Sequence, residues 1–328
     1  MPTALKLLLG LLATVLIACG GGASGGAAAP GSAPIASAQE LQCQAAGWQR
    51  VVVPVAGLDR LALWKAPANA IWSQGAVVVM HGGGGSHTNF CVANVALIEP
   101  QLRFATQAMA AGFAVFLLDS SDRVTDDMGR VCGKVWDDQV NPRANLDLPF
   151  VEQMLGSVIP GKRPAGSRAE IFLTGLSSGG YMAVRAATRH GERIAAFAPV
   201  SAGDPYGWKR DCTPRAGDRS NVFGVGLDLE TGRNINDPGA CSAATHANER
   251  PWDSSAGAVR APFRQFHHER DGVNDLSCVE KAAAQLVAHG YPQTAALRLT
   301  GTTRDVALHY WLDDYNTPLL AYFSGFVR

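Results

Sequence analysis

The sequence predicts an α/β fold with a mostly parallel sheet, helices on both faces and long loops inserted after strands. Three observations favour this class. Short apolar runs typical of buried strands alternate with segments whose apolar residues recur at helical spacing. Hydrophobic residues make up 47% of the 328 residues and charged residues only 17%, so the chain can build a large core. Two long stretches rich in Gly, Pro, Asp and Arg interrupt the alternation, as inserted loops do.

The strands and helices can be assigned in order along the chain. The predicted strands are the apolar runs at residues 51–55, 61–64, 75–80, 113–118, 170–174, 194–200, 260–267 and 295–299. The predicted helices lie at residues 100–111, 145–159, 179–190, 276–289 and 316–327. The first two strands surround a turn at 57–59, and 75–80 (GAVVVM) is continuously apolar, as in strands buried on both faces. Gly112 ends the first helix, and residues 145–159 place their apolar side chains on one face.

The first 39 residues are expected to direct export of the protein and to tether it to a membrane. Residues 1–18 contain Lys6 and then a twelve-residue apolar run, which is too short to span a bilayer and typical of a signal peptide. The letters LIAC that end at Cys19 resemble a bacterial lipobox, so we expect cleavage before Cys19 and lipid on its side chain. An ordinary secretory signal is the alternative. Residues 19–39 are uncharged and rich in Gly, Ala, Ser and Pro, which predicts a flexible tether.

The remaining residues, 40–328, are expected to form one catalytic domain with an insertion at about 202–259. We expect this domain to be exported and held at the bacterial cell envelope, either in the periplasm or on the cell surface. If the lipobox interpretation is wrong, the protein is secreted. The insertion and the other long loop, at 119–141, both follow predicted strands, and ligands bind at that end of a parallel sheet. We therefore expect these loops to form part of a binding site.

Ser177 is the candidate nucleophile. It lies in Gly175-Leu176-Ser177-Ser178-Gly179, between a predicted strand and a predicted helix, which matches the G-x-S-x-G elbow of serine hydrolases. Glycines on both sides allow a sharp turn that exposes the serine at a helix N-terminus, where backbone N–H groups stabilise developing negative charge. The glycine spacing favours Ser177 over Ser178 as the attacking residue.

A second glycine-rich turn, His81 to Gly85, follows the strand at 75–80 and matches an oxyanion loop of the HGGG type. The expected oxyanion donors are the backbone N–H of Gly82 or Gly83 together with that of Ser178. His81 is expected to brace this loop. The turn contains neither a G-x-G-x-x-G pattern nor a GK[ST] ending, which argues against a nucleotide site.

A serine nucleophile needs a base and an acid that orients the base, in the chain order Ser, Asp or Glu, His. His309, in LHYW between the last predicted strand and helix, is the candidate base. Asp271 follows a predicted strand and is the candidate acid. Asp275 is its main alternative, followed by Glu269 and Asp253.

The motifs GLSSGGYMA around Ser177, the glycine-rich turn at His81, the D-G-V turn at Asp271 and H-Y-W at His309 resemble the poly(3-hydroxybutyrate) depolymerase and feruloyl esterase group of α/β-hydrolases. The resemblance covers about residues 75–328. It implies an α/β-hydrolase fold and an esterase that acts through Ser177, Asp271 and His309. It also implies hydroxyalkanoate or aromatic acyl esters as substrates.

The sequence departs from that group in two ways. Only 19 residues follow His309, which leaves no room for a polymer-binding domain, and the protein is expected to be lipid-tethered. Both features favour soluble oligomers or small esters over crystalline polymer. A peptidase of the prolyl-oligopeptidase type, and an envelope lipoprotein without catalytic activity, remain as alternatives.

The aromatic side chains of the long loops are candidates for the walls of an acyl pocket. They are Trp136, Tyr206, Trp208 and Trp252, with Trp311 beside His309. We expect no metal and no cofactor, because the proposed chemistry needs neither. The 28 basic and 28 acidic residues balance, so nucleic acid is not an expected partner.

Six cysteines follow Cys19, and an even number in an exported protein suggests three disulfides. They are Cys43, Cys91, Cys132, Cys212, Cys241 and Cys278. Fifteen pairings are possible. Cys212 and Cys241 form a plausible local pair, because both lie in the insertion.

Overall fold

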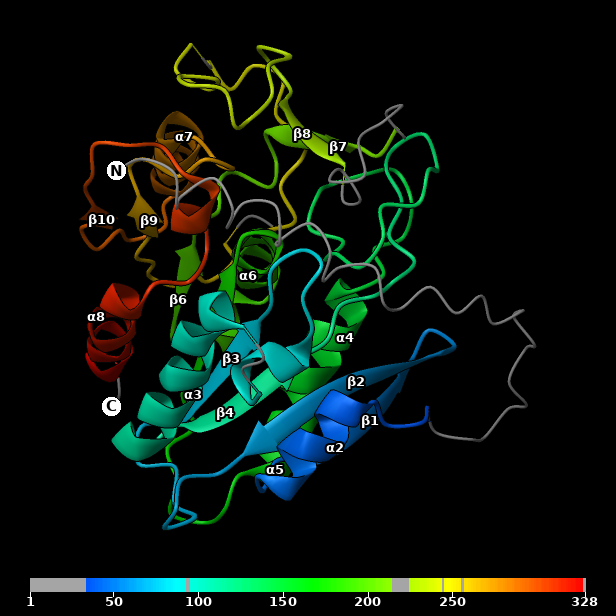
Figure 1. Cartoon of the computed structure of the whole chain (residues 1–328), viewed down its shortest axis with the longest axis vertical. Helices are drawn as coiled ribbons and strands as arrows, with labels where there is room; N and C mark the ends of the chain where they lie inside the picture. The colour runs from blue at the N-terminus through cyan, green and yellow to red at the C-terminus, as the bar shows by residue number, and fades with distance from the viewer. Residues whose placement is uncertain (1–33, 93–94, 214–223, 244, 255–256, 327–328) are drawn as a thin grey trace, which may run out of the picture. The chain divides into compact units, whose positions relative to one another are not determined.

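The computed structural model describes residues 34–92, 95–213, 224–243, 245–254 and 257–326. Its centre is a sheet of eight strands in the order β1-β2-β4-β3-β5-β6-β9-β10 (Figure 1). These strands are β1 Gln49–Val55, β2 Leu58–Lys65, β3 Ala76–Met80, β4 Ala114–Leu118, β5 Ile171–Leu176, β6 Ala196–Val200, β9 Phe266–His268 and β10 Leu297–Leu299. β2 pairs antiparallel with β1 and β4, and all other neighbours are parallel. The predicted mostly parallel sheet is confirmed.

Helices cover both faces of this sheet. They are α2 Ala38–Ala45, α3 Glu99–Ala111, α4 Leu148–Gln153, α5 Ile159–Lys162, α6 Ser178–Arg189, α7 Leu276–Ala288 and α8 Asp313–Ser324. Short turns of other helix types are η2 His87–Phe90, η3 Ala96–Ile98, η4 Met154–Val158, η5 Gly191–Arg193 and η6 Val306–His309. Val77 and Val79 of β3 pack into the core formed with α3 and α8. Val78 and Met80 of the same strand enter the opposite core, with α4 and α6. This alternation explains why the central strands read as continuous apolar runs.

The helix predicted at 145–159 is divided in the structure. It begins at Leu148, passes through one π turn at Met154–Val158 and continues as α5. Pro160 lies in the first turn of α5. A proline there would clash with the carbonyl four residues earlier in a continuous α-helix, and a π turn relieves that clash.

Two predicted strand boundaries were wrong. The turn between β1 and β2 is formed by Ala56 and Gly57, with φ of 49° and 77°, rather than by residues 57–59. The strand predicted at 260–267 is reduced to Phe266–His268, preceded by isolated bridges at Phe263. Pro262 interrupts the ladder, because proline has no N–H to donate.

The N-terminal boundary of the folded part lies slightly earlier than expected. Helix α2 begins at Ala38, and the Ser37 hydroxyl accepts the Glu40 N–H while the Glu40 side chain accepts the Ser37 N–H. This capping box explains the start of α2. The predicted signal peptide and Cys19 lie outside the described residues. No helix among the described residues is long and apolar enough to cross a membrane.

The structure contains three disulfides, as expected, but their pairing differs from the one suggested. The bonds are Cys43–Cys91, Cys132–Cys212 and Cys241–Cys278. The suggested Cys212–Cys241 pair is wrong, because each cysteine lies against a different part of the fold. Cys212 follows β7 (Trp208–Asp211) and contacts the loop at 119–141, whereas Cys241 contacts α7.

The insertion predicted at about 202–259 contains an element that sequence reasoning missed. β7 pairs antiparallel with β8, Val225–Asp228, to form a small separate sheet. Figure 1 shows this pair beyond the N-terminal end of α6, at the carboxyl edge of the central sheet. The insertion therefore lies at the edge where a parallel sheet binds ligands.

Candidate active site

Ser177 occupies the turn between β5 and α6 with φ 51° and ψ −120°, a region that residues with side chains rarely adopt. A Cβ atom at Gly175 would lie 2.4 Å from the Gly179 carbonyl oxygen, and one at Gly179 would lie 2.3 Å from that of Met80. Only glycine fits at either position. The two glycines thus permit the strained turn that presents the Ser177 side chain at the N-terminus of α6.

Asp271 and His309 form a buried pair. His309 Nδ1 lies 2.8 Å from Asp271 Oδ2, and Asp271 Oδ1 accepts the backbone N–H groups of Val273 at 2.7 Å and Asn274 at 3.0 Å. Burial opposes ionisation of Asp271, but His309 and these hydrogen bonds hold its pKa below the ordinary value. The carboxylate therefore remains charged and fixes the imidazole with Nδ1 as donor.

The three other acids considered from the sequence serve other purposes. Asp275 caps α7 by accepting the Ser277 N–H at 3.0 Å. Glu269 accepts the Gly301 N–H at 3.2 Å, and Asp253 forms an ion pair with Arg185 at 2.8 Å. Of the four candidates, the structure places the Asp271 carboxylate against His309.

Ser177 and His309 line one pocket of about 530 Å³ together with Gly82, Gly83 and Ser178. The structure thus brings the candidate nucleophile, base and oxyanion residues to one cavity. The Gly82 carbonyl accepts the Gly85 N–H at 3.0 Å and the His81 Nδ1–H at 2.7 Å. Because a trans peptide holds its C=O and N–H on opposite sides, these bonds also orient the Gly83 N–H.

Trp136 does not wall the pocket as expected. It is fully buried, and its indole N–H donates to the His81 carbonyl at 2.8 Å while its backbone N–H donates to Ser178 Oγ at 2.9 Å. This residue therefore connects the glycine-rich turn to the start of α6. Those two segments carry the expected oxyanion donors.

Three of the other four aromatic candidates also pack elsewhere. Trp311 lies in the core against Phe90 and Phe104, and its indole N–H donates to Asn316 at 2.7 Å. The rings of Tyr206 and Trp252 stack on each other with centroids 4.4 Å apart. Trp208 lines the pocket. Large aromatic side chains in loops are often buried in the nearest hydrophobic core. Of the five candidates, only Trp208 lines the pocket.

Several pocket residues were missed from the sequence. They include Tyr181, Asp138, Arg210, Asn234, Asn236 and Tyr310. Tyr181 could have been found, because it lies four residues after Ser177 and so shares its helix face. Asp138 lies in the loop at 119–141 and Arg210 lies on β7, and neither is marked by a local sequence pattern.

Asp138 and Arg210 form a buried charge pair at the pocket, with Arg210 Nη2 2.9 and 3.1 Å from the two carboxylate oxygens. Burial raises the pKa of Asp138 to about 6, although the Arg210 charge opposes this rise. The ring of Trp208 lies 5.0 Å from that of Tyr181. The pocket thus combines an ion pair, in which the two opposite charges compensate each other, with an aromatic surface.

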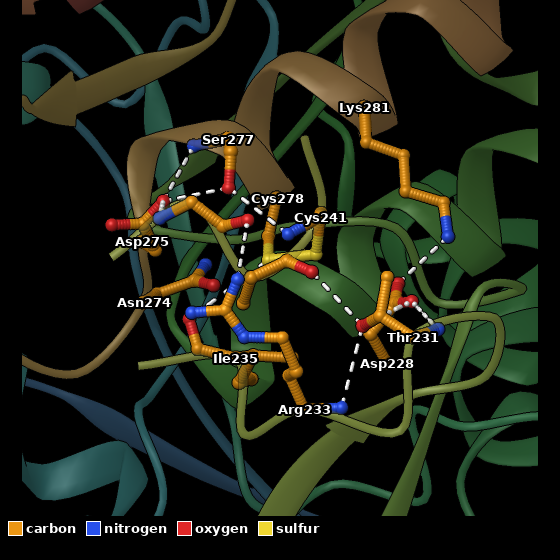
Figure 2. Close-up of a disulfide and its surroundings, with 12 residues drawn as sticks. Asp228, Thr231, Arg233, Ile235, Cys241, Asn274, Asp275, Ser277, Cys278 and Lys281 are labelled. Atoms are coloured by element: carbon orange, nitrogen blue, oxygen red, sulfur yellow. Dashed lines mark hydrogen bonds and ion pairs between the residues drawn. A yellow bond between two sulfur atoms is a disulfide. The ribbon is translucent and has the colours of Figure 1, made fainter. Parts of the chain in front are cut away.

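The insertion is fastened to α7, as Figure 2 shows. Cys241 is bonded to Cys278, the Cys241 N–H donates to Ser277 Oγ at 3.1 Å, and Lys281 Nζ lies 2.7 Å from Asp228 Oδ2. Ile235, in the same segment, lines the pocket. One wall of the pocket is therefore held in place by contacts with α7.

Replacing both Cys241 and Cys278 by alanine should lower the free energy of unfolding by about 2–4 kcal/mol, as loss of a native disulfide does. It should also raise KM for an ester more than it lowers kcat, because the bond supports the pocket wall and not the Asp271–His309 pair. Urea unfolding and Michaelis kinetics of the full chain test this. The matched change, alanine at Cys43 and Cys91, should cost stability but leave KM unchanged. Equal KM values in the two double variants would contradict the assignment.

No group of three or more His, Cys, Asp or Glu in the described part of the chain could hold a metal ion.

The sheet order, the strained serine turn between β5 and α6, and the Asp271–His309 pair define a protein with the α/β-hydrolase fold. Solved structures support this class. An acetyl xylan esterase from Aspergillus awamori is similar over 84% of this chain and 99% of its own, with a TM-score of 0.51 and 17% identity. An S-formylglutathione hydrolase from Agrobacterium tumefaciens is similar over 86% of this chain and 95% of its own, with a TM-score of 0.51 and 13% identity. No family model and no curated protein matches the sequence.

Proposed function

We propose that this protein is a serine hydrolase of carboxylic esters. One observation carries the proposal. Ser177, His309, Gly82, Gly83 and Ser178 all line one pocket, and the buried Asp271 carboxylate lies 2.8 Å from His309 Nδ1 behind it. This is the set of groups that acyl transfer through a serine requires.

The mechanism follows from the position of each group. His309 accepts the Ser177 proton as the serine oxygen attacks the ester carbonyl. The N–H groups of Ser178 and of the Gly82–Gly83 turn stabilise the resulting oxyanion. Collapse of this intermediate releases the alcohol, which takes the proton from His309, and leaves an acyl-enzyme. A water activated by His309 then releases the acid, while Asp271 keeps the imidazole oriented.

We further propose hydroxyalkanoate oligomers or small or aromatic acyl esters as substrates. The motif resemblance to the poly(3-hydroxybutyrate) depolymerase and feruloyl esterase group supports this class. So does the pocket, because Trp208, Tyr181 and Ile235 offer an apolar and aromatic surface in a volume of about 530 Å³. Pockets of that size enclose small molecules rather than a folded polymer surface.

Hydrolysis of p-nitrophenyl esters from acetyl to palmitoyl, with a feruloyl ester and a dipeptidyl amide in the same series, tests the proposal on the full chain. We expect hydrolysis of short or aromatic esters and no comparable cleavage of the amide. Amide cleavage at rates equal to ester cleavage would favour a peptidase. A folded protein that hydrolyses no ester and is not labelled by a fluorophosphonate at Ser177 would favour a binding protein.

A further inference from the structure

Behind the glycine-rich turn lies a row of buried polar side chains that the proposed reaction does not use directly. We call Glu40, His87, Asp119 and His81 the buried relay. They come from α2, from η2 and from the segments after β4 and β3. Each is at most 7% exposed. The row therefore extends from the N-terminal helix to the oxyanion turn through the protein interior.

His87 is the centre of the relay. Its Nδ1 lies 3.0 Å from Asp119 Oδ1, and its Nε2 lies 3.3 Å from Glu40 Oε1. A neutral imidazole has one N–H and can donate to only one of these carboxylates, whereas the cation donates to both. Two buried carboxylates on opposite sides of one ring therefore favour the charged form of His87.

Each carboxylate of the relay has one further cation. Arg50 Nε, on β1, lies 3.2 Å from Glu40 Oε1. Lys134 Nζ, on the loop at 119–141, lies 2.6 Å from Asp119 Oδ2. The titratable and charged groups that face His87 or its two partners are thus Glu40, Asp119, Arg50, Lys134 and, beyond Asp119, His81. The Ser86 hydroxyl also lies 3.1 Å from His87 Nδ1, and the His87 backbone N–H donates to Asp119 Oδ1 at 3.2 Å. The disulfide Cys43–Cys91 fastens α2 to η2 beside them.

The relay ends at the oxyanion turn. His81 Nε2 accepts the Ser120 N–H at 3.1 Å and lies 3.3 Å from Asp119 Oδ1. Its Nδ1–H donates to the Gly82 carbonyl, and this bond orients the Gly83 N–H. Lys134 contributes a second link, because its carbonyl accepts the Gly84 N–H at 2.8 Å. The positions of Asp119 and Ser120 therefore determine the orientation of His81 and, through it, of the Gly83 N–H, the expected oxyanion donor.

We propose that His87 is a positioning residue that, as a cation between Glu40 and Asp119, holds the oxyanion turn in its productive geometry. The inference rests on the proposed ester hydrolysis. Loss of the His87 proton removes one donor from either Asp119 or Glu40. Each carboxylate keeps its other cation and a backbone N–H, so the relay weakens rather than separates, and the contacts that orient His81 loosen. The enzyme then keeps its nucleophile and base but stabilises the oxyanion less well.

The direction of the pH dependence follows from the surroundings of His87. Burial lowers its pKa, but the hydrogen bonds and charges of Asp119 and Glu40 outweigh burial and hold the pKa above its ordinary value. The hydrogen bond from His87 likewise lowers the pKa of Glu40 to about 2. A raised histidine pKa means that the stabilisation is complete below the unfolded pKa and is lost as pH rises through the folded one. We therefore expect an alkaline limb in kcat.

The test is the pH profile of kcat and KM for one p-nitrophenyl ester, measured on the full chain between about pH 6 and 10. His87→Gln should lower kcat at neutral pH about tenfold, change KM less than about twofold and abolish the alkaline limb, because glutamine is neutral throughout. Glu40→Gln should move that limb to lower pH, because it removes a charge that favours the cation. Inhibition by a boronic acid, which mimics the tetrahedral intermediate, should weaken in parallel with kcat.

The control is Glu280→Gln, the same change in an exposed ion pair with Arg298, which should leave the profile unchanged. If His87→Gln and Glu40→Gln lower the unfolding temperature but keep the wild-type kcat profile, the relay is only structural and the inference is overturned. If His87→Gln does not fold, Glu40→Gln tests the inference. A shift of the alkaline limb to lower pH supports it, and an unchanged limb overturns it. A wild-type protein without ester turnover would instead contradict the proposed function.

Discussion

Replacing Ser177 by alanine should lower kcat for ester hydrolysis by about four to six orders of magnitude, as removal of a triad serine does. The variant keeps the oxyanion turn and His309 but has no oxygen to attack the carbonyl. Alanine is also compatible in size, so the fold should be retained. Kinetics with p-nitrophenyl acetate and fluorophosphonate labelling measure the effect.

Ser178→Ala is the matched control. The Ser178 hydroxyl accepts the Trp136 N–H, but the expected oxyanion donor is the backbone N–H of Ser178, which alanine keeps. We expect at most about a tenfold loss of kcat, small beside the loss of an oxyanion donor. If Ser178→Ala were the inactive variant and Ser177→Ala the active one, the assignment of the nucleophile would be wrong.

Replacing Asp271 by asparagine should lower kcat by about four orders of magnitude, or roughly 5 kcal/mol in activation free energy. The amide keeps the size of the side chain but removes the charge that stabilises the imidazolium. Its NH₂ group can also face His309 Nδ1, which favours the tautomer that cannot accept the Ser177 proton. Steady-state kinetics at neutral pH test this, with circular dichroism to show that the variant folds.

Asp275→Asn is the control for Asp271→Asn. It removes a nearby negative charge without changing the carboxylate that contacts His309. Asp275 is four residues away, caps α7 and accepts the Gly239 N–H at 3.0 Å. Asparagine is as good an N-cap as aspartate, so we expect little change in stability and less than about a fivefold change in kcat. A large loss of kcat in Asp275→Asn with full activity in Asp271→Asn would reverse the assignment of the acid.

The central fold was accessible from the sequence because its signals are local. The runs that form β3 and β4 are apolar at every position, and the glycines at 175 and 179 mark the elbow without reference to other parts of the chain. The contact between Asp271 and His309 could be predicted because both follow strands of the same parallel sheet.

The residues that form the pocket walls could not be predicted from local sequence signals. Trp136 lies in the loop at 119–141 and Trp208 lies on β7 of the insertion. Only the fold determines that Trp136 is buried behind the oxyanion turn and that Trp208 lines the cavity. The disulfides show the same limit. Cys212 lies nearer to Cys241 in sequence than to Cys132, but β7 directs it toward the loop at 119–141. Contacts between loops depend on three-dimensional positions that no periodic pattern encodes.

The two disulfides of the insertion have a consequence for molecular recognition. Cys132–Cys212 joins the loop at 119–141 to the end of β7, and Cys241–Cys278 joins the segment after β8 to α7. The two long loops are thus covalently joined to each other, and the insertion is joined to a helix of the scaffold. A substrate then meets a shape that is set before it arrives, and little binding energy is consumed in ordering these segments. Selection among esters should accordingly follow how well an acyl group fits a preformed cavity, with small entropic losses on binding.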